Sequence, residues 1–116
     1  MPKISGVFIN HHIAELHGAN FELLDDQQKL LAKTRGVARE LKLTILNTFI
    51  HRFEPHGLSL VLVISQSHLA IHTWPEFGYM HVDLVTCSEN ANLDSFQQVL
   101  QNHFSPQKIS SRKINY

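Results

Sequence analysis

The sequence predicts an α+β fold, a two-layer α/β sandwich in which an antiparallel sheet carries helices packed on one face. Two observations support this prediction. Apolar segments rich in β-branched residues follow one another with only short turn signals between them, which favours antiparallel pairing of consecutive strands. Two other segments repeat their apolar residues every three or four positions, as a helix with one buried face does.

The first strand is predicted over residues 4–16, where β-branched and aromatic side chains are frequent. A helix is predicted over residues 25–41, because the inward positions from Leu30 to Leu41 recur at spacings of four, three and four. The acidic residues Asp25 and Asp26 stand at its start, where the positive end of the helix dipole stabilises negative charge.

The second half of the chain is predicted to be mostly strand. A second helix is the exception, because Phe96, Leu100 and Phe104 form a single apolar stripe. The predicted segments are strands at 43–53, 58–64, 68–74, 79–87 and 106–114, turns at 54–57 and 75–78, a loop at 88–92 and a helix at 93–104.

The stretch from Leu58 to Trp74 is unusual because it has no glycine or proline, although strands usually run about 3–10 residues. Its polar interruption is Ser65-Gln66-Ser67, so a sharp bend is predicted there without the residues that make bending easy. Strained backbone of this kind concentrates at functional sites. A long bent edge strand is the alternative interpretation.

Length and composition limit the possible functions. The 116 residues are expected to form one domain, and ten basic residues balance ten acidic ones, which gives no electrostatic footprint for nucleic acid or an anionic membrane. A single cysteine excludes an intramolecular disulfide framework. The chain turns polar too early for a signal peptide, and its longest apolar run, 60–64, is too short to span a membrane, so a cytoplasmic protein is expected.

Nine histidines stand out, since imidazole titrates near neutral pH and also binds metals. His68, His72, His81 and Cys87 are a conceivable zinc-ligand set. The chain lacks an HExxH or CxxC motif, and no metal site is predicted.

Two segments are more specific. They are Phe53-Glu54-Pro55-His56-Gly57-Leu58-Ser59 and the run from Ser65 through Ser67-His68-Leu69-Ala70-Ile71-His72-Thr73-Trp74-Pro75-Glu76 to Tyr79, followed by Asp83 and Thr86-Cys87. Together they closely resemble the bacterial and archaeal short form of S-adenosylmethionine decarboxylase, a pyruvoyl-dependent enzyme of spermidine biosynthesis. Length and element order agree as well, so the resemblance covers essentially the whole chain.

The resemblance implies that the domain of residues 1–116 cuts itself between Gln66 and Ser67, giving chains 1–66 and 67–116. The Ser67 hydroxyl attacks the preceding carbonyl, and elimination and hydrolysis then convert Ser67 into a pyruvoyl group. In the family, the residue at the His72 position accepts a proton during processing, and the residue at the Ser59 position assists by hydrogen bonding.

The resemblance also implies how catalysis proceeds. The pyruvoyl cofactor forms a Schiff base with the substrate's α-amine and withdraws electrons as carbon dioxide leaves. A cysteine at the Cys87 position donates the proton to the resulting carbanion. A thiol suits this task because, with a pKa of about 8.5, it is mostly protonated at neutral pH.

S-adenosylmethionine as substrate is implied by Phe53, Trp74 and Glu76, which stand where the family places two pocket aromatics and a ribose-binding acid. Aromatic faces stack on adenine and attract the sulfonium cation, and a carboxylate accepts hydrogen bonds from the ribose diol. Glu15 is a further, weaker candidate for lining the site.

The sequence departs from the family pattern in three places. Gln66 replaces the usual glutamate at the cut, Gly18-Ala19 stands where a Gly-Cys or Asp-Cys pair is usual, and His81 replaces a small residue. Two alternatives therefore stay open: a pyruvoyl decarboxylase of ornithine or arginine with the same fold, and an unprocessed paralogue that binds a nucleoside or a partner subunit. The family's short form is a homodimer of processed protomers with sites at the interface, so the same is expected here.

Overall fold

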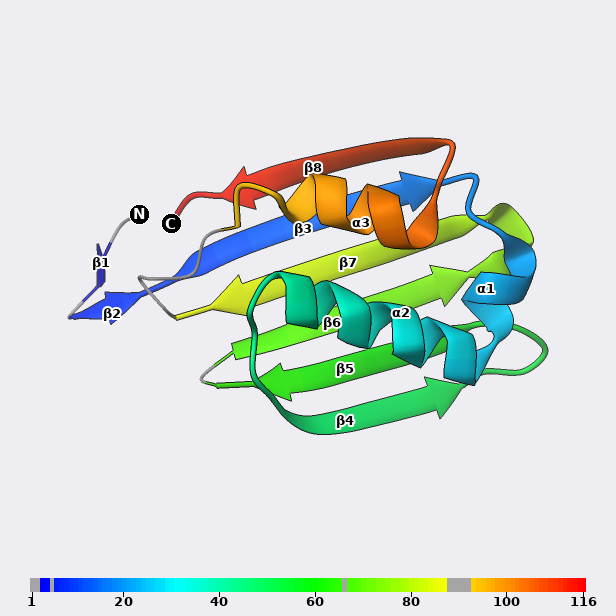
Figure 1. The fold of residues 1–116 in the computed structure, drawn as a ribbon, viewed down its shortest axis with the longest axis horizontal. Helices are drawn as coiled ribbons and strands as arrows, with labels where there is room; N and C mark the ends of the chain where they lie inside the picture. The colour runs from blue at the N-terminus through cyan, green and yellow to red at the C-terminus, as the bar shows by residue number, and fades with distance from the viewer. Residues whose placement is uncertain (1–2, 5, 66, 88–92) are drawn as a thin grey trace.

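The computed structural model describes residues 3–4, 6–65, 67–87 and 93–116 (Figure 1). The elements, in chain order, are β1 (Lys3–Ile4), β2 (Val7–Phe8), β3 (Asn10–His17), α1 (Phe21–Asp25), α2 (Gln27–Glu40), β4 (Ile45–Arg52), β5 (Leu58–Ile64), β6 (Ser67–Trp74), the 3-10 helix η1 (Pro75–Phe77), β7 (Tyr79–Thr86), α3 (Phe96–Phe104) and β8 (Lys108–Ile114).

Six strands form one antiparallel sheet in the order β4-β5-β6-β7-β3-β8. The strands from β4 to β7 are neighbours in sequence as well as in space, as short turns between them require. The strand β3, from the start of the chain, is inserted between β7 and β8. The short strands β1 and β2 form a separate two-stranded ribbon at one end of the sheet (Figure 1).

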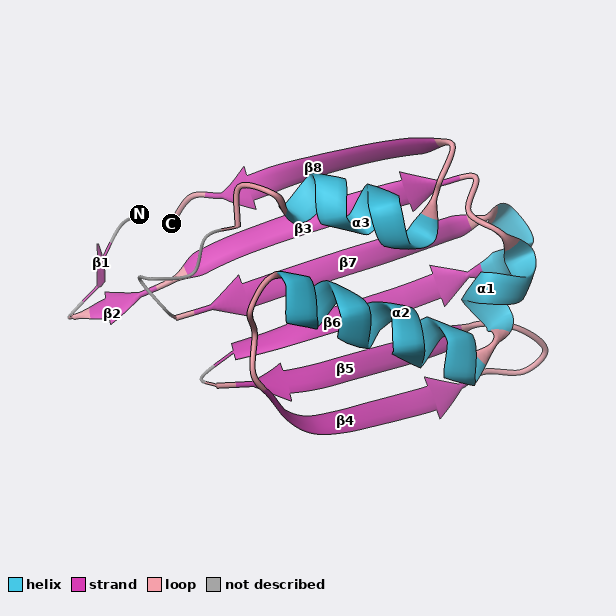
Figure 2. Ribbon diagram, in the orientation of Figure 1, coloured by secondary structure: helices cyan, strands magenta, loops and turns pink. Residues whose placement is uncertain are grey.

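The helices lie on a single face of the sheet (Figure 2). Between the helices and the sheet lies one apolar core, in which Phe96 and Phe104 of α3 and Leu30 of α2 are almost completely buried. The helices α1 and α2 begin where side chains cap their free N–H groups: Asn20 accepts from the Leu23 N–H, and Asp26 accepts from the Lys29 N–H. Within the described residues, no element covers the opposite face of the sheet.

The predicted fold class is confirmed, and the predicted strands at 58–64 and 106–114 agree closely with β5 and β8. One predicted strand was wrong, and one helix was not predicted. The first strand is not continuous over 4–16, because Gly6, with φ of 81°, separates β1 from β2 before β3 begins. The helix predicted over 25–41 agrees with α2 to within two residues, and the extended Asp26 caps its start; the short helix α1 just before it was not predicted.

The stretch from Leu58 to Trp74 does reverse direction as predicted, since β5 and β6 pair antiparallel from Ile64 opposite Ser67 onward. Both strands lie inside the sheet, so the alternative of one long edge strand was wrong. The cleavage residue Gln66 and the predicted loop at 88–92 lie outside the described residues. In the part of the chain that the structure describes, no helix is long and apolar enough to cross a membrane.

Candidate active site

The uncovered face of the sheet collects the polar side chains of the strands. Because side chains alternate between the two faces of a strand, every second residue of β3 to β8 points away from the helices. Six of the nine histidines occupy such positions: His11, His17, His51, His68, His72 and His81. We call this surface the open face.

Ser59 and His72 form a hydrogen-bonded pair on the open face. They stand directly opposite each other on β5 and β6, and the Ser59 Oγ lies 2.6 Å from the His72 Nδ1. Both side chains are partly exposed, so solvent or a ligand can reach them. A hydroxyl and an imidazole at this distance can pass a proton between them, which is the work that the resemblance implies for these residues.

Ser67 and Cys87 form a second pair at the other end of β6. The backbone N–H of Cys87 donates to the Ser67 Oγ at 2.9 Å, which holds the serine oxygen beside the residue that carries the thiol. Cys87 follows directly after β7, and its side chain is partly exposed. The sheet therefore places the two residues expected at the reacting centre next to each other, although 20 positions separate them in sequence.

One chain does not bring the two pairs together. Ser67 and His72 lie five residues apart on the continuous strand β6, which is about 17 Å at the usual rise of a strand. The contacts of the described residues thus assemble two half-sites, one with Ser59 and His72 and one with Ser67 and Cys87.

The predicted substrate-binding aromatics lie beside the Ser59–His72 half-site. Phe53 follows β4 and Trp74 ends β6, with 47% and 42% of their surfaces exposed. Gly57 lies between these two residues, across the sheet. On one side the Phe53 N–H donates to the Gly57 carbonyl, and on the other side the β5–β6 register, extended by one residue beyond Leu58, places Gly57 opposite Trp74. A residue without a side chain thus separates two exposed aromatic rings. We call this arrangement the aromatic slot.

Glu76 lies in η1, two residues after Trp74, and its side chain is exposed. Glu15 is on the open face, where Tyr79 donates a hydrogen bond to its Oε2 at 2.7 Å. Burial and this hydrogen bond raise the pKa of Tyr79 to about 12, and the same bond lowers the pKa of Glu15. The Tyr79 ring also contacts Trp74, with 5.4 Å between ring centroids, so this pair supports one wall of the aromatic slot.

Sequence reasoning missed a carboxylate with two imidazole partners in the middle of the open face. The Asp83 oxygens lie 2.6 Å from the His11 Nε2 and 2.8 Å from the His68 Nε2, and the His11 Nδ1 lies 2.9 Å from the Tyr116 hydroxyl. Burial acts to raise the pKa of Asp83, but the two imidazole hydrogen bonds together outweigh it and hold that pKa below its usual value. The alternation of β7 could have placed Asp83 on this face, but its partners come from β3 and β6 and depend on strand order.

The four candidate zinc ligands do not converge. His68 is bonded to Asp83 and His72 to Ser59, and among the residues that the structure describes no three His, Cys, Asp or Glu side chains are placed to hold a metal ion.

A hollow of about 440 Å³ lies on the helix side of the sheet and contains no residue predicted for the site. Its lining consists of Phe21, Glu22, Asp25, Asp26, Gln27, Lys29 and Arg52.

The chain is similar to proteins of one known family. Residues 10–115 match the family model described as S-adenosylmethionine decarboxylase. The chain is 46% identical over 82 residues to an S-adenosylmethionine decarboxylase proenzyme of Thermosipho africanus, an overlap that covers 71% of this chain and 63% of that protein's length. It is 38% identical over 104 residues to the proenzyme of the same name from Pelotomaculum thermopropionicum, covering 90% of this chain and 82% of the relative.

Two solved structures share the fold. The adenosylmethionine decarboxylase from Aquifex aeolicus superimposes with a TM-score of 0.82 at 25% identity, over 93% of this chain and 89% of that one. The Trypanosoma brucei AdoMetDC-delta26 monomer superimposes with a TM-score of 0.65 at 14% identity, over 88% of this chain and 44% of that one, which shows likeness of fold alone.

Proposed function

This chain belongs to the S-adenosylmethionine decarboxylase family, and we propose that it is a self-cleaving, pyruvoyl-dependent decarboxylase of S-adenosylmethionine. The product would be S-adenosylmethioninamine, the aminopropyl donor for spermidine biosynthesis. The observation that carries the proposal is the pair of half-sites on the sheet: Ser67 bonded to the Cys87 backbone, and Ser59 bonded to His72.

Processing begins at Ser67. Its Oγ attacks the carbonyl carbon of the peptide bond between residues 66 and 67, and that carbon–nitrogen bond breaks as an ester forms. Removal of the Ser67 α-proton expels the carboxylate of residue 66 and leaves dehydroalanine, which takes up water, releases ammonia and becomes the pyruvoyl group. His72, held by Ser59 at 2.6 Å, is the residue proposed to accept a proton in this sequence.

The residues around Ser67 fit a pyruvoyl group. Ser67 is the hydroxyl residue from which such a group is made, and the hydrogen bond from the Cys87 N–H places its oxygen beside the residue carrying the chain's single thiol. The bound group supplies an electron sink for decarboxylation. Cys87 is proposed to hold the proton that the reaction then needs, since a thiol is protonated at neutral pH and transfers its proton readily.

The aromatic slot is proposed to bind the adenosyl part of the substrate. Phe53 and Trp74 are separated by the width of two strand spacings, about 9–10 Å, which admits a flat ring between them. Two exposed aromatic faces favour both an adenine ring and a sulfonium cation. Glu76, exposed two residues after Trp74, can accept the two hydrogen bonds of a ribose diol.

A homodimer is proposed because the half-sites are about 17 Å apart within one chain. A second copy, related by a two-fold axis and packed on the open face, can bring its Ser59 and His72 to Cys87 of the first, at the end of the sheet where Ser67 begins β6. Each site would then take residues from both chains.

Co-expression of two inactive variants tests the shared site. His72→Ala keeps the Ser67–Cys87 half-site, and Ser67→Ala keeps the Ser59–His72 half-site. Mixed dimers should contain one complete site and cleave the His72→Ala chain, whereas neither variant cleaves alone. Absence of cleavage in a verified mixed dimer contradicts a shared site.

Denaturing mass spectrometry tests the proposed function directly. The purified protein should separate into two chains cut between residues 66 and 67, with the larger fragment N-terminal. Ser67→Ala should abolish cleavage and activity, and Cys87→Ser should still cleave but lose most of its turnover. A single chain of 13.3 kDa that persists after long incubation contradicts the enzyme proposal and favours an unprocessed binding protein.

The substrate is decided by carbon dioxide release from the cleaved protein. S-adenosylmethionine should be decarboxylated and ornithine and arginine should not, because the latter two have no ring to occupy the aromatic slot. Release from ornithine or arginine instead would assign the protein to a different substrate class within the same fold.

A further inference from the structure

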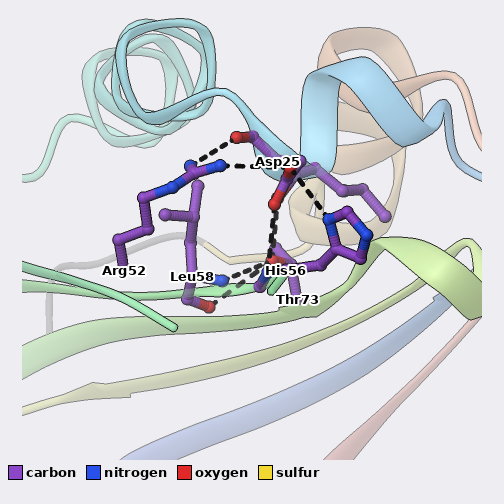
Figure 3. Close-up of polar contacts among 7 residues, drawn as sticks. Asp25, Arg52, His56, Leu58 and Thr73 are labelled. Atoms are coloured by element: carbon purple, nitrogen blue, oxygen red, sulfur yellow. Dashed lines mark hydrogen bonds and ion pairs between the residues drawn. The ribbon is translucent and has the colours of Figure 1, made fainter. Parts of the chain in front are cut away.

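Asp25, the last residue of α1, contacts both sides of the turn that carries Phe53 (Figure 3). Its Oδ1 accepts a hydrogen bond from the Gly57 N–H at 3.0 Å, and its Oδ2 lies 3.2 Å from Arg52 Nη2 and 3.4 Å from His56 Nδ1. The Asp25 backbone carbonyl accepts a further hydrogen bond from Arg52 Nη1 at 2.7 Å. One residue thereby holds the chain just before Phe53 and again just after it.

The carboxylate that makes these contacts is kept in its charged form. The hydrogen bond from the Gly57 N–H lowers the pKa of Asp25, and His56 and Arg52 act in the same direction against the opposing effect of burial. Only 14% of the Asp25 side chain is exposed, and such a group is stable in this position because each oxygen has a donor.

Gly57 is confined from the other side by β6. It has a φ of +110°, and a Cβ atom there would lie 3.1 Å from the Thr73 carbonyl oxygen, so the backbone approaches β6 closely. The Thr73 hydroxyl accepts from the Leu58 N–H at 2.9 Å and donates to the Leu24 carbonyl at 2.8 Å. The end of α1 is therefore bonded to the turn through Asp25 and to the strand carrying Trp74 through Leu24.

We propose that Asp25 is a positioning residue that fixes the aromatic slot, and that affinity for the adenine ring of the substrate depends on it through Phe53. The inference rests on the proposed function. Asp25 acts from the helix side of the sheet and touches neither aromatic ring in the contacts above; it sets the Gly57 backbone that separates them. Loss of the carboxylate should let the 53–57 turn move, so that Phe53 no longer stays in register opposite Gly57.

Steady-state kinetics of the cleaved enzyme test this proposal. Asp25→Ala should raise the KM for S-adenosylmethionine and the inhibition constant of adenosine about tenfold, while kcat stays within about twofold. Inhibition by methionine, which lacks the adenine ring, should not change. Phe53→Ala should raise the same two constants, and the double variant should be no worse than Phe53→Ala alone, because Asp25 acts through Phe53.

Asp26→Ala is the matched control. Asp26 is the neighbouring carboxylate, and it caps α2 through the Lys29 N–H without contact to the turn, so its loss removes a helix cap and should leave KM unchanged. Asp25→Asn keeps an oxygen that can accept from the Gly57 N–H, so it should recover most of the affinity. It also gives a folded variant if Asp25→Ala proves unstable.

A second readout separates this inference from the proposed function. Asp25→Ala should accelerate hydrogen exchange of the Gly57 amide at least tenfold, and Asp26→Ala should not. Equal exchange in the two variants, a fall in kcat without a change in KM, or additive effects of Asp25→Ala and Phe53→Ala would each overturn the inference. If the wild-type protein neither cleaves nor decarboxylates, the proposed function is overturned. The role of Asp25 is then decided by comparing adenosine affinity and Gly57 amide exchange between the wild type and Asp25→Ala.

Discussion

The two faces of the sheet are built from the same strands and have opposite characters. On β5, Leu58, Leu60 and Leu62 point toward the helices and are almost completely buried, whereas Ser59 and Val61 between them are half-buried on the open face. The neighbouring strand β6 repeats the pattern, with buried Leu69 and Ile71 alternating with the partly exposed His68, Ala70 and His72. Because successive side chains of a strand point to opposite faces, one strand supplies both core residues and reactive surface residues. A shift of its pairing by one residue would exchange the two faces.

The helix-covered face is closed within one chain, whereas no element of the described residues covers the open face. The core between helices and sheet is closed and apolar. Among the described residues of the open face, polar groups are instead held in small sets: Ser59 with His72, Asp83 with His11 and His68, and Glu15 with Tyr79. A side-chain change on the covered face should therefore alter the free energy of unfolding, and one on the open face should alter chemistry or association.

The largest effect is expected at His72 on the open face. His72→Ala should slow self-cleavage at least about 100-fold, the usual range for loss of a positioned acid or base, while the free energy of unfolding changes by less than about 1 kcal/mol. The fraction of cleaved chain against time, measured by mass spectrometry, and urea unfolding of the uncleaved protein check the two halves of this expectation. His81→Ala, opposite His72 on β7, is the matched control and should cleave within about threefold of the wild-type rate.

An intermediate effect is expected where two adjacent residues of β5 face opposite sides. Leu60→Ala removes a completely buried side chain and should lower the free energy of unfolding by about 2–5 kcal/mol. Val61→Ala, on the open face, should cost only about 1 kcal/mol, because its side chain is half-buried. Urea unfolding followed by circular dichroism measures both values. Equal losses at the two positions would contradict the assignment of the faces.

The smallest effect is expected at Asp83 and concerns acid stability. A carboxyl with a lowered pKa in the folded chain stabilises it at pH values above the unfolded pKa, and this contribution disappears as the pH falls through the folded pKa. Asp83→Asn should therefore flatten the dependence of stability on pH below about pH 4. Unfolding free energies measured from pH 6 downward test this. An exposed carboxylate of α1 supplies the control, Glu22→Gln, whose curve should follow that of the wild type.

Much of the fold could be predicted because it depends on local pattern. Turn residues at 54–57 and 75–78 and the apolar segments between them located β4 to β7 to within a few residues. The prediction failed at two places near the start of the chain: Gly6 divides the first strand, and the short helix α1 was not predicted. Glycine at a positive φ is a local turn signal that the prediction of one long strand passed over, and a helix of five residues is too short to show a repeat of apolar positions.

The candidate site was predicted from motifs, and those motifs name residues without placing them. Pairing of Ser59 with His72 follows from the β5–β6 register, which the predicted bend did not specify. The contact of Asp25 with Arg52 joins residues that are 27 positions apart in sequence, and the contact of Asp83 with His11 joins residues that are 72 positions apart. No periodicity in the sequence reports such pairs, since they depend on strand order and on where α1 ends.

Element types, turns and the family motif with its serine, histidine and cysteine were all predictable from the amino-acid sequence. The physical reason is that turns and alternation act over a few residues. Tertiary structure alone decided that β3 lies beside β7, that Ser67 and His72 lie at opposite ends of one strand, and that Asp25 reaches the turn of Phe53. These facts depend on the long-range pairing of strands and on helix packing, which bring distant residues into contact only when the whole sheet forms.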